Sequence, residues 1–146
     1  MPMEIRECRR RDLDDVYEIE KTSFPHPYDR DVFEAYLMRV EHSSFDGFLV
    51  AAEGEKVAGY VIVEYGRRGL IVSMAVRADM RRKKVGTSLL KEALLRLSKE
   101  CREVTLQVGV SNLKAQDLYR AFGFSIVKTL RGYYPDGEDA YLMEKR

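Results

Sequence analysis

The sequence predicts an α/β fold in which helices flank one central, mixed but mostly antiparallel sheet. Three observations lead to this fold class. The 146 residues suffice for one domain, which we expect to span residues 1–146. Segments with apolar residues at helical spacing alternate with short β-rich runs. One unit, from Leu70 to Val110, has the order strand, helix, strand.

The elements can be assigned in order along the chain. Asp12 is expected to cap the first helix, which ends before two prolines, Pro25 and Pro27. The predicted strands are Met3 to Cys8, Phe48 to Ala52, Val57 to Tyr65, Leu70 to Val76, Val104 to Val110, Phe124 to Gly132 and Ala140 to Lys145. The other predicted helices are Asp29 to His42, Val85 to Cys101 and Leu113 to Phe122.

The strand–helix–strand unit indicates where a ligand binds. Two strands joined through a helix are parallel, so the N-terminus of that helix points out of the carboxyl edge of the sheet. Ligands of α/β proteins bind at this edge.

Composition and charge exclude several classes of protein. Lys+Arg 25 against Asp+Glu 24 gives a net charge of +1, so no global field draws the chain to nucleic acid or to a membrane. Apolar runs such as Val57 to Val63 are far shorter than the ~20 residues that cross a bilayer. Met1 to Asp12 is rich in Arg and Glu, so we expect no secretion signal and a cytoplasmic location. Cys8 and Cys101 lack metal-type spacing, and we expect buried thiols and no metal site.

A basic segment lies directly before the third predicted helix. Free backbone N–H groups and the positive end of the helix dipole form an anion site there, and four cationic side chains add to it. The single glycine matches neither a Walker loop nor a dinucleotide fingerprint, so a solvated basic face stays an alternative to a phosphate site. The segment consists of Arg81, Arg82, Lys83, Lys84, Val85, Gly86 and Thr87.

A second motif follows the last strand of the parallel unit, with Asn112, Ala115 and Tyr119 at fixed spacing before Gly123-Phe124. Together with the basic segment, it resembles the GCN5-related N-acetyltransferase superfamily, whose signatures are Arg/Gln-x-x-Gly-x-Gly/Ala and Asn-x-x-Ala-x-x-x-Tyr-x-x-x-Gly-Phe. The tail from Gly132 to Met143 is similar to that of RimI-like ribosomal-protein acetyltransferases and of archaeal and eukaryotic N-terminal acetyltransferase subunits.

The resemblance implies acetyl-CoA as the donor, bound where two central strands splay apart, and it implies no metal. The pyrophosphate would lie on the amides of residues 81–87. Asn112 would hold the pantetheine arm, and Tyr119 would stand near the sulfur. The arm would pair like an extra strand with the main chain of Met74, Ala75 and Val76.

The chemistry of acetyl transfer agrees with these roles. Attack of an amine on a thioester creates an oxyanion and expels a thiolate, so the site needs N–H donors and a proton donor. A main-chain N–H near Val76 and the phenol of Tyr119 would supply them. Two structural alternatives stay open, because Tyr119 could pack on the sheet alone and Asn112 could serve only as a helix cap. Lys84 replaces the first glycine of the phosphate loop and would carry a strain of roughly 1 kcal/mol in a left-handed backbone.

The general base that the resemblance would supply is missing. Many relatives have Glu or His at the position of Gln107, and some archaeal relatives have His at that of Leu70. Gln107 can orient a water but cannot accept a proton for good. His26 follows Phe24-Pro25, where eukaryotic-type subunits have a Glu, and an imidazole that titrates near about 6.5 is a suitable base. A loop histidine without a role is the alternative.

We therefore predict acetyl transfer to the N-terminal α-amine of proteins, with ribosomal proteins among the candidate partners. An α-amine with a pKa of about 7.7 to 8.0 is already about 10% neutral at pH 7, whereas a lysine at about 10.4 needs roughly 4.6 kcal/mol. A site without an obvious carboxylate base suits the α-amine. The mouth of the substrate site would be lined by Phe24, Tyr28, Tyr133 and Tyr134.

Two alternatives to this function stay open. The first is another acetyltransferase of the same superfamily, which acts on lysine, a polyamine or a small metabolite. The second is an acyl-CoA-binding module without turnover, which the missing base favours. Neither nucleic acid nor a membrane is expected as a partner.

Overall fold

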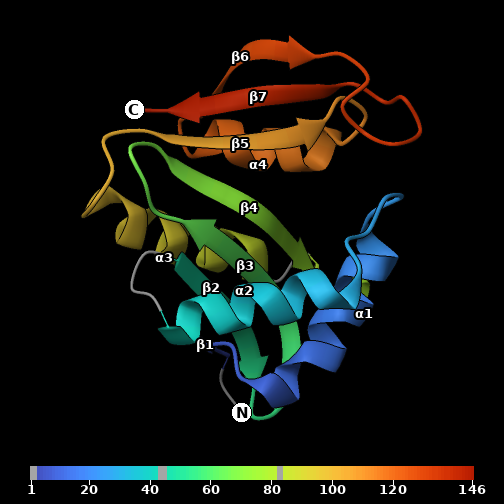
Figure 1. Ribbon diagram of the computed structural model, residues 1–146, viewed down its shortest axis with the longest axis vertical. Coiled ribbons are helices and arrows are strands. Elements are labelled where there is room, and N and C mark those ends of the chain that lie inside the picture. The colour runs from blue at the N-terminus through green and yellow to red at the C-terminus, as the bar shows by residue number, and fades with distance from the viewer. Residues whose placement is uncertain (1–2, 43–45, 82–83) are drawn as a thin grey trace.

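The computed structural model describes residues 3–42, 46–81 and 84–146. Within these residues, seven strands form one sheet with the order β1-β2-β3-β4-β5-β7-β6 (Figure 1). The pair of β4 and β5 is parallel and the other neighbouring pairs are antiparallel, so the predicted fold class is confirmed. The strands are β1 (Glu4–Glu7), β2 (Asp46–Glu53), β3 (Lys56–Glu64), β4 (Gly69–Val76), β5 (Val104–Gly109), β6 (Ser125–Leu130) and β7 (Ala140–Lys145).

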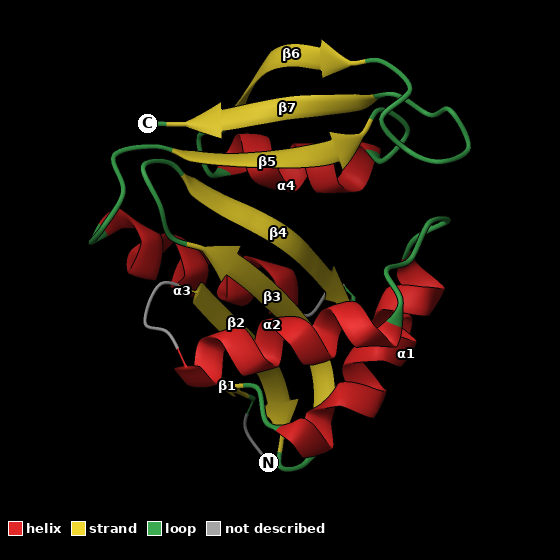
Figure 2. Ribbon diagram, in the orientation of Figure 1, coloured by secondary structure: helices red, strands yellow, loops and turns green. Residues whose placement is uncertain are grey.

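Helices cover both faces of this sheet (Figure 2). They are α1 (Leu13–Ser23), α2 (Arg30–His42), α3 (Val85–Ser98) and α4 (Leu113–Ala121). Alternate residues of β2 point to opposite faces, so Phe48 and Val50 join the core under α1 and α2, whereas Leu49 and Ala51 join the core under α3. Burial on both faces explains why β2 and β3 are almost continuously apolar.

The two central strands pair only at their start. β4 and β5 are in register at Gly69 with Val104, Leu70 with Thr105 and Ile71 with Leu106. Beyond these residues the strands diverge toward their carboxyl ends, as Figure 1 shows. The rest of β4 therefore has a free edge on the side of β5, and this opening is where the ligand was expected.

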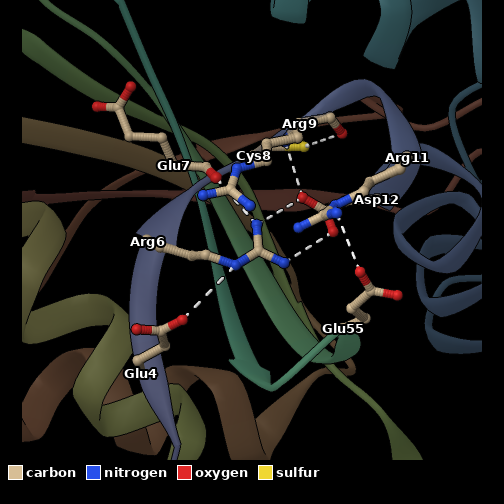
Figure 3. A network of polar contacts seen from close by, with 8 residues as sticks. All are labelled: Glu4, Arg6, Glu7, Cys8, Arg9, Arg11, Asp12 and Glu55. Atoms are coloured by element: carbon tan, nitrogen blue, oxygen red, sulfur yellow. Dashed lines mark hydrogen bonds and ion pairs between the residues drawn. The ribbon is translucent and has the colours of Figure 1, made fainter.

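The corner before α1 is held by a buried ion pair (Figure 3). Asp12 is 2% exposed and accepts two hydrogen bonds from the Arg6 guanidinium, at 2.7 and 2.9 Å, and one from the Arg9 N–H at 2.8 Å. The expectation that Asp12 caps α1 is wrong, because its side chain makes no hydrogen bond to the first turn of that helix. Its carboxylate instead accepts the N–H of Arg9, three residues earlier, and so closes the short 3-10 turn Arg10–Asp12.

The end of α3 and the state of the two cysteines were also predicted. Helix α3 ends at Ser98, before the predicted Cys101, which is nevertheless buried where the chain turns away. Both cysteines are buried free thiols, as predicted, and burial followed by the nearby Asp12 raises the pKa of Cys8 to about 12. In the described part of the chain, no helix has the length and apolar character that a membrane span requires.

Candidate active site

A cavity of about 800 Å³ opens where β4 and β5 separate. Ser73 and Met74 of β4 line it on one side, and Gln107 and Val108 of β5 line it on the other. Helix α4 and two loops complete the wall, namely the loop between α1 and α2 and the loop between β6 and β7. Both loops lie at the end of the sheet where the strands diverge (Figure 1).

Most residues expected near the reacting groups line this one cavity. They are Phe24, His26, Tyr28, Met74, Gln107, Asn112, Tyr119, Tyr133 and Tyr134. Ala75 and Val76 continue the free edge of β4 beyond the residues that line the cavity, and the expected phosphate segment follows β4 along the chain. Two members of that segment, Arg82 and Lys83, lie outside the described residues.

Tyr119 projects from α4 into the cavity wall and is 7% exposed. Its ring packs edge-on against Phe124, with 5.8 Å between the ring centroids. Burial, and then the neighbouring phenol of Tyr134, raises the pKa of Tyr119 to about 12. Its hydroxyl has no hydrogen-bond partner among the described residues. The phenol therefore stays protonated at neutral pH and is available to a ligand.

Three amide side chains at the end of β5 differ in their use. Asn112 Oδ1 accepts the N–H of Ala115 at 3.3 Å, so this residue caps α4, as the structural alternative requires. Gln116 is 2% exposed and donates to the carbonyls of Gly109 and Val110, both at 3.0 Å, which fixes α4 to β5. Gln107 is half-buried in the cavity wall. It directly follows Leu106, the last residue of β5 that pairs with β4.

His26 joins the two loops over the cavity. Its Nε2 lies 3.0 Å from Oδ2 of Asp136, in a polar contact that is not aligned as a hydrogen bond. Its ring stacks on Tyr134, with centroids 5.5 Å apart. The loops thus meet over the sheet, as an aromatic mouth requires. Glu138 brings a third group, since one ligand atom from each of His26, Asp136 and Glu138 lies within 4.8 Å of the others. These groups could ligate a cation, although Ser111 Oγ already donates to Glu138 at 2.7 Å.

Arg81 and Lys84 are the described residues of the segment before α3 that was expected to bind phosphate. Lys84 has φ 61° and ψ 21°, the left-handed backbone that a glycine would adopt without strain. Arg81 donates to the Val76 carbonyl at 3.2 Å and to Ser23 Oγ at 3.3 Å, so it ties the end of β4 to α1. A Cβ at Gly86 would make ordinary contacts of 3.6 Å, so the fold itself does not need glycine there.

A carboxylate in the cavity wall was missed at the level of sequence. Glu20 in α1 is 2% exposed and lines the cavity, so the expectation that the site lacks a carboxylate is wrong. Its spacing could have revealed it, because Leu13, Val16 and Glu20 stand at i, i+3 and i+7 on the buried face of one helix. Ser73 of β4 donates a hydrogen bond to Glu20, and no pattern in the sequence indicates this residue.

The fold and the motifs together define the class of protein. Residues 13–124 match the family model described as Acetyltransferase (GNAT) family, and this chain belongs to that family. An N-alpha-acetyltransferase of Saccharolobus solfataricus is 35% identical over 97% of this chain and 91% of its own length. A putative [ribosomal protein bS18]-alanine N-acetyltransferase of Bacillus subtilis is 33% identical over 95% and 92%. The crystal structure of Ard1 from Thermoplasma volcanium superposes with a TM-score of 0.90 at 28% identity, covering 99% and 97%.

Proposed function

We propose that this chain transfers the acetyl group of acetyl-CoA to the N-terminal α-amine of proteins, by direct attack of the amine on the thioester. One observation carries the proposal. The free edge of β4, the hydroxyl of Tyr119 and the two joined loops converge on a single cavity. The similarity to relatives named for N-terminal acetylation supports the same reaction.

Acetyl-CoA would bind across the opening between β4 and β5. Its pantetheine arm would pair with the main chain of Met74, Ala75 and Val76, as an added strand does. Asn112 would hold the arm from the other side while it caps α4. The pyrophosphate would lie on the amides of residues 81–87, where the dipole of α3 favours an anion.

Tyr119 would act on the leaving sulfur. A phenol with a pKa of about 12 does not give its proton for good to a thiolate, whose conjugate acid has a pKa of about 8.5. Tyr119 would therefore donate a hydrogen bond to the sulfur and pass on a proton only as it regains one from the attacking nitrogen. The oxyanion would take an N–H near Val76, and Gln107 would orient a water beside the amine.

The acceptor would enter through the mouth between the two loops. Tyr28 and Tyr133 are 43% and 48% exposed there, and Phe24 and Tyr134 also line the wall. Such a mouth suits the extended end of a polypeptide. Ribosomal proteins are the substrates that we propose first, because of the similarity to the Bacillus subtilis relative, and the cytoplasm is the expected location.

A peptide panel tests this function. Short peptides that begin with Ser, Ala, Thr, Met or Glu are incubated with enzyme and acetyl-CoA, and release of the CoA thiol is followed. N-terminally blocked peptides with an internal lysine and a polyamine are the matched controls. We expect thiol release with free N-termini alone. Turnover of the lysine or polyamine controls instead would favour another acetyltransferase, and CoA binding without thiol release would favour a binding module.

A further inference from the structure

Glu20 is a buried carboxylate that faces the candidate acceptor site. It lies near the end of α1, is 2% exposed, and lines the cavity between β4 and β5. The ion pairs formed within the described residues do not include it. It therefore differs from Asp12, the other buried carboxylate of this region, which Arg6 neutralises.

Three donors hold this carboxylate in place. Oε1 accepts the hydroxyl of Tyr60 on β3 and that of Ser73 on β4, the latter at 3.2 Å. Oε2 accepts the N–H of Tyr28 at 3.0 Å. The two hydroxyls also contact each other, with 2.9 Å between Tyr60 Oη and Ser73 Oγ. A carboxylate has about four acceptor sites, so one remains, and it is on Oε2.

Hydrogen bonds to an ionised carboxylate favour its charged form, whereas burial without a cation disfavours that form. A cation that binds in the cavity would offset that cost. The α-ammonium of a protein N-terminus is such a cation, and the proposed reaction brings it to this cavity in every cycle. Glu20 thus has the charge, the burial and the free acceptor site that the ammonium requires.

The position of the network also suits the reaction. Ser73 precedes Met74, where the pantetheine arm is proposed to pair, so its hydroxyl lies beside the expected thioester. The phenols of Tyr60 and Tyr119 are close enough for a charge on one to raise the pKa of the other. Glu20, Ser73 and Tyr119 therefore surround the same space from α1, β4 and α4.

From this geometry we infer that Glu20, with Ser73 as the bridging hydroxyl, binds the acceptor ammonium and receives its first proton. The inference rests on the proposed function. The ammonium gives a proton to the Ser73 hydroxyl as that hydroxyl passes its own to Glu20, which leaves a neutral amine. The amine forms the C–N bond, the C–S bond breaks, and the second nitrogen proton reaches the thiolate through Tyr119. Glu20 returns its proton to water when the products leave.

The groups around Glu20 give the test a clear pH window. The tyrosines that contact it are Tyr60 from β3, through its phenol, and Tyr28 from the loop, through its backbone N–H, with Tyr119 across the cavity. Burial raises the pKa of all three above the usual value near 10, so none ionises between pH 6 and 8. The remaining titratable groups of the wall lie at the mouth and are His26, Tyr133, Tyr134 and Glu138, and His26 is removed in a second background.

The experiment compares the pH dependence of kcat/KM for a free-N-terminus peptide between pH 6 and 8. With Glu20 as acceptor, the wild type uses the ammonium form and its profile is nearly flat. Glu20→Gln must take free amine from solution, so its kcat/KM falls about tenfold per pH unit below the α-amine pKa of about 7.7 to 8.0. At pH 7 we expect a loss of roughly a hundredfold, with the Kd for CoA unchanged. The same slopes are expected in the His26→Ala background.

Glu64→Gln is the matched control, since Glu64 also accepts a tyrosine hydroxyl, that of Tyr36 at 3.0 Å, but lies outside the cavity. It should keep the flat profile. If Glu20→Gln does not fold, Ser73→Ala removes only the bridge and should show the same slope, and Ser73→Thr should restore the flat profile. A variant with a wild-type profile, or with an equal loss at every pH, overturns the inference. A wild type inactive on all peptides overturns the proposed function instead.

Discussion

The two ends of helix α1 each hold a buried carboxylate, and their surroundings are opposite. Asp12, directly before the helix, lies against Arg6 and the Arg9 N–H (Figure 3). Glu20, near the other end, is just as buried but is held by two hydroxyls and one N–H. The first charge is neutralised inside the fold, whereas the second faces a cavity. The difference indicates that Asp12 stabilises the protein, and it agrees with the role in binding the acceptor that we infer for Glu20.

Removing the Asp12 carboxylate should have the largest effect on the stability of the protein. Asp12→Ala leaves the Arg6 guanidinium, whose side chain is 12% exposed, without its partner. Removing one member of a buried pair typically costs 3–5 kcal/mol, so we expect a loss of about 3 kcal/mol in the free energy of unfolding by denaturant. Acetyl transfer per folded molecule should stay unchanged. Asp14→Ala, which removes an exposed carboxylate paired with Arg30, is the control and should change stability little.

The same pair predicts a pH dependence of stability. Burial alone would raise the pKa of Asp12, but the hydrogen bonds from Arg6 and from the Arg9 N–H outweigh it and lower the pKa below the usual value. A lowered folded pKa stabilises above the unfolded pKa of about 3.9, and that stabilisation is lost as the pH falls through the folded pKa. Wild-type stability should therefore decline below about pH 4, and Asp12→Ala should decline less. If the stability of the wild type and of Asp12→Ala fell equally at acid pH, the effect would not be due to Asp12.

Two tyrosines that face the cavity region, Tyr60 and Tyr119, also differ in their hydrogen-bond partners. Tyr60 is satisfied by Glu20 and Ser73, whereas the Tyr119 hydroxyl has no partner in the described chain. Tyr119→Phe keeps the ring packed on Phe124 but removes the proposed donor to the sulfur. We expect a drop in kcat of roughly a hundredfold, about 2.7 kcal/mol, with little change in the Kd for CoA. Normal kcat in the variant would instead make Tyr119 a packing residue, and a loss of thermal stability would mean that its hydroxyl is a structural hydrogen-bond partner.

How far the sequence leads depends on the range of the interaction. The strand–helix–strand unit and the motif around Tyr119 are local, so the parallel pair of β4 and β5 and the helix after β5 could be predicted. The opening between these strands and the left-handed backbone considered for Lys84 were expectations from the resemblance, and the order of the seven strands in the sheet was not predicted. The pairing of His26 with Asp136 joins residues on two distant loops, and sequence spacing does not report such contacts. Glu20 was missed for another reason, since a glutamate in a helix is usually taken as solvent-exposed although its spacing here matches the buried face.

Two roles are open to His26, namely holding the two loops over the substrate and accepting a proton from it, and each role predicts a different kinetic effect of its removal. Because it contacts Asp136 and stacks on Tyr134, His26→Ala should loosen the two loops over the mouth. We expect KM for peptides to rise about tenfold, some 1.4 kcal/mol, with kcat and CoA binding nearly unchanged. The pH profile decides between the two roles. Loss of an acidic limb of the pH profile in the variant would make His26 the proton acceptor that the sequence suggested.

The smallest effect is expected at Lys84, on the phosphate side of the site. Its left-handed backbone strains a residue with a Cβ by about 1 kcal/mol, and glycine relieves that strain while adding freedom to the unfolded chain. Lys84→Gly should therefore raise the free energy of unfolding by less than about 1 kcal/mol. The backbone amides that would hold the pyrophosphate are kept, so CoA binding should weaken only through the lost charge, and less so at high salt. Lys84→Ala removes the same charge but keeps the strain, so it should match Lys84→Gly in CoA affinity and not in stability. The free energy of unfolding of both variants is measured with denaturant in the absence of CoA. Equal values would contradict a strained backbone at Lys84.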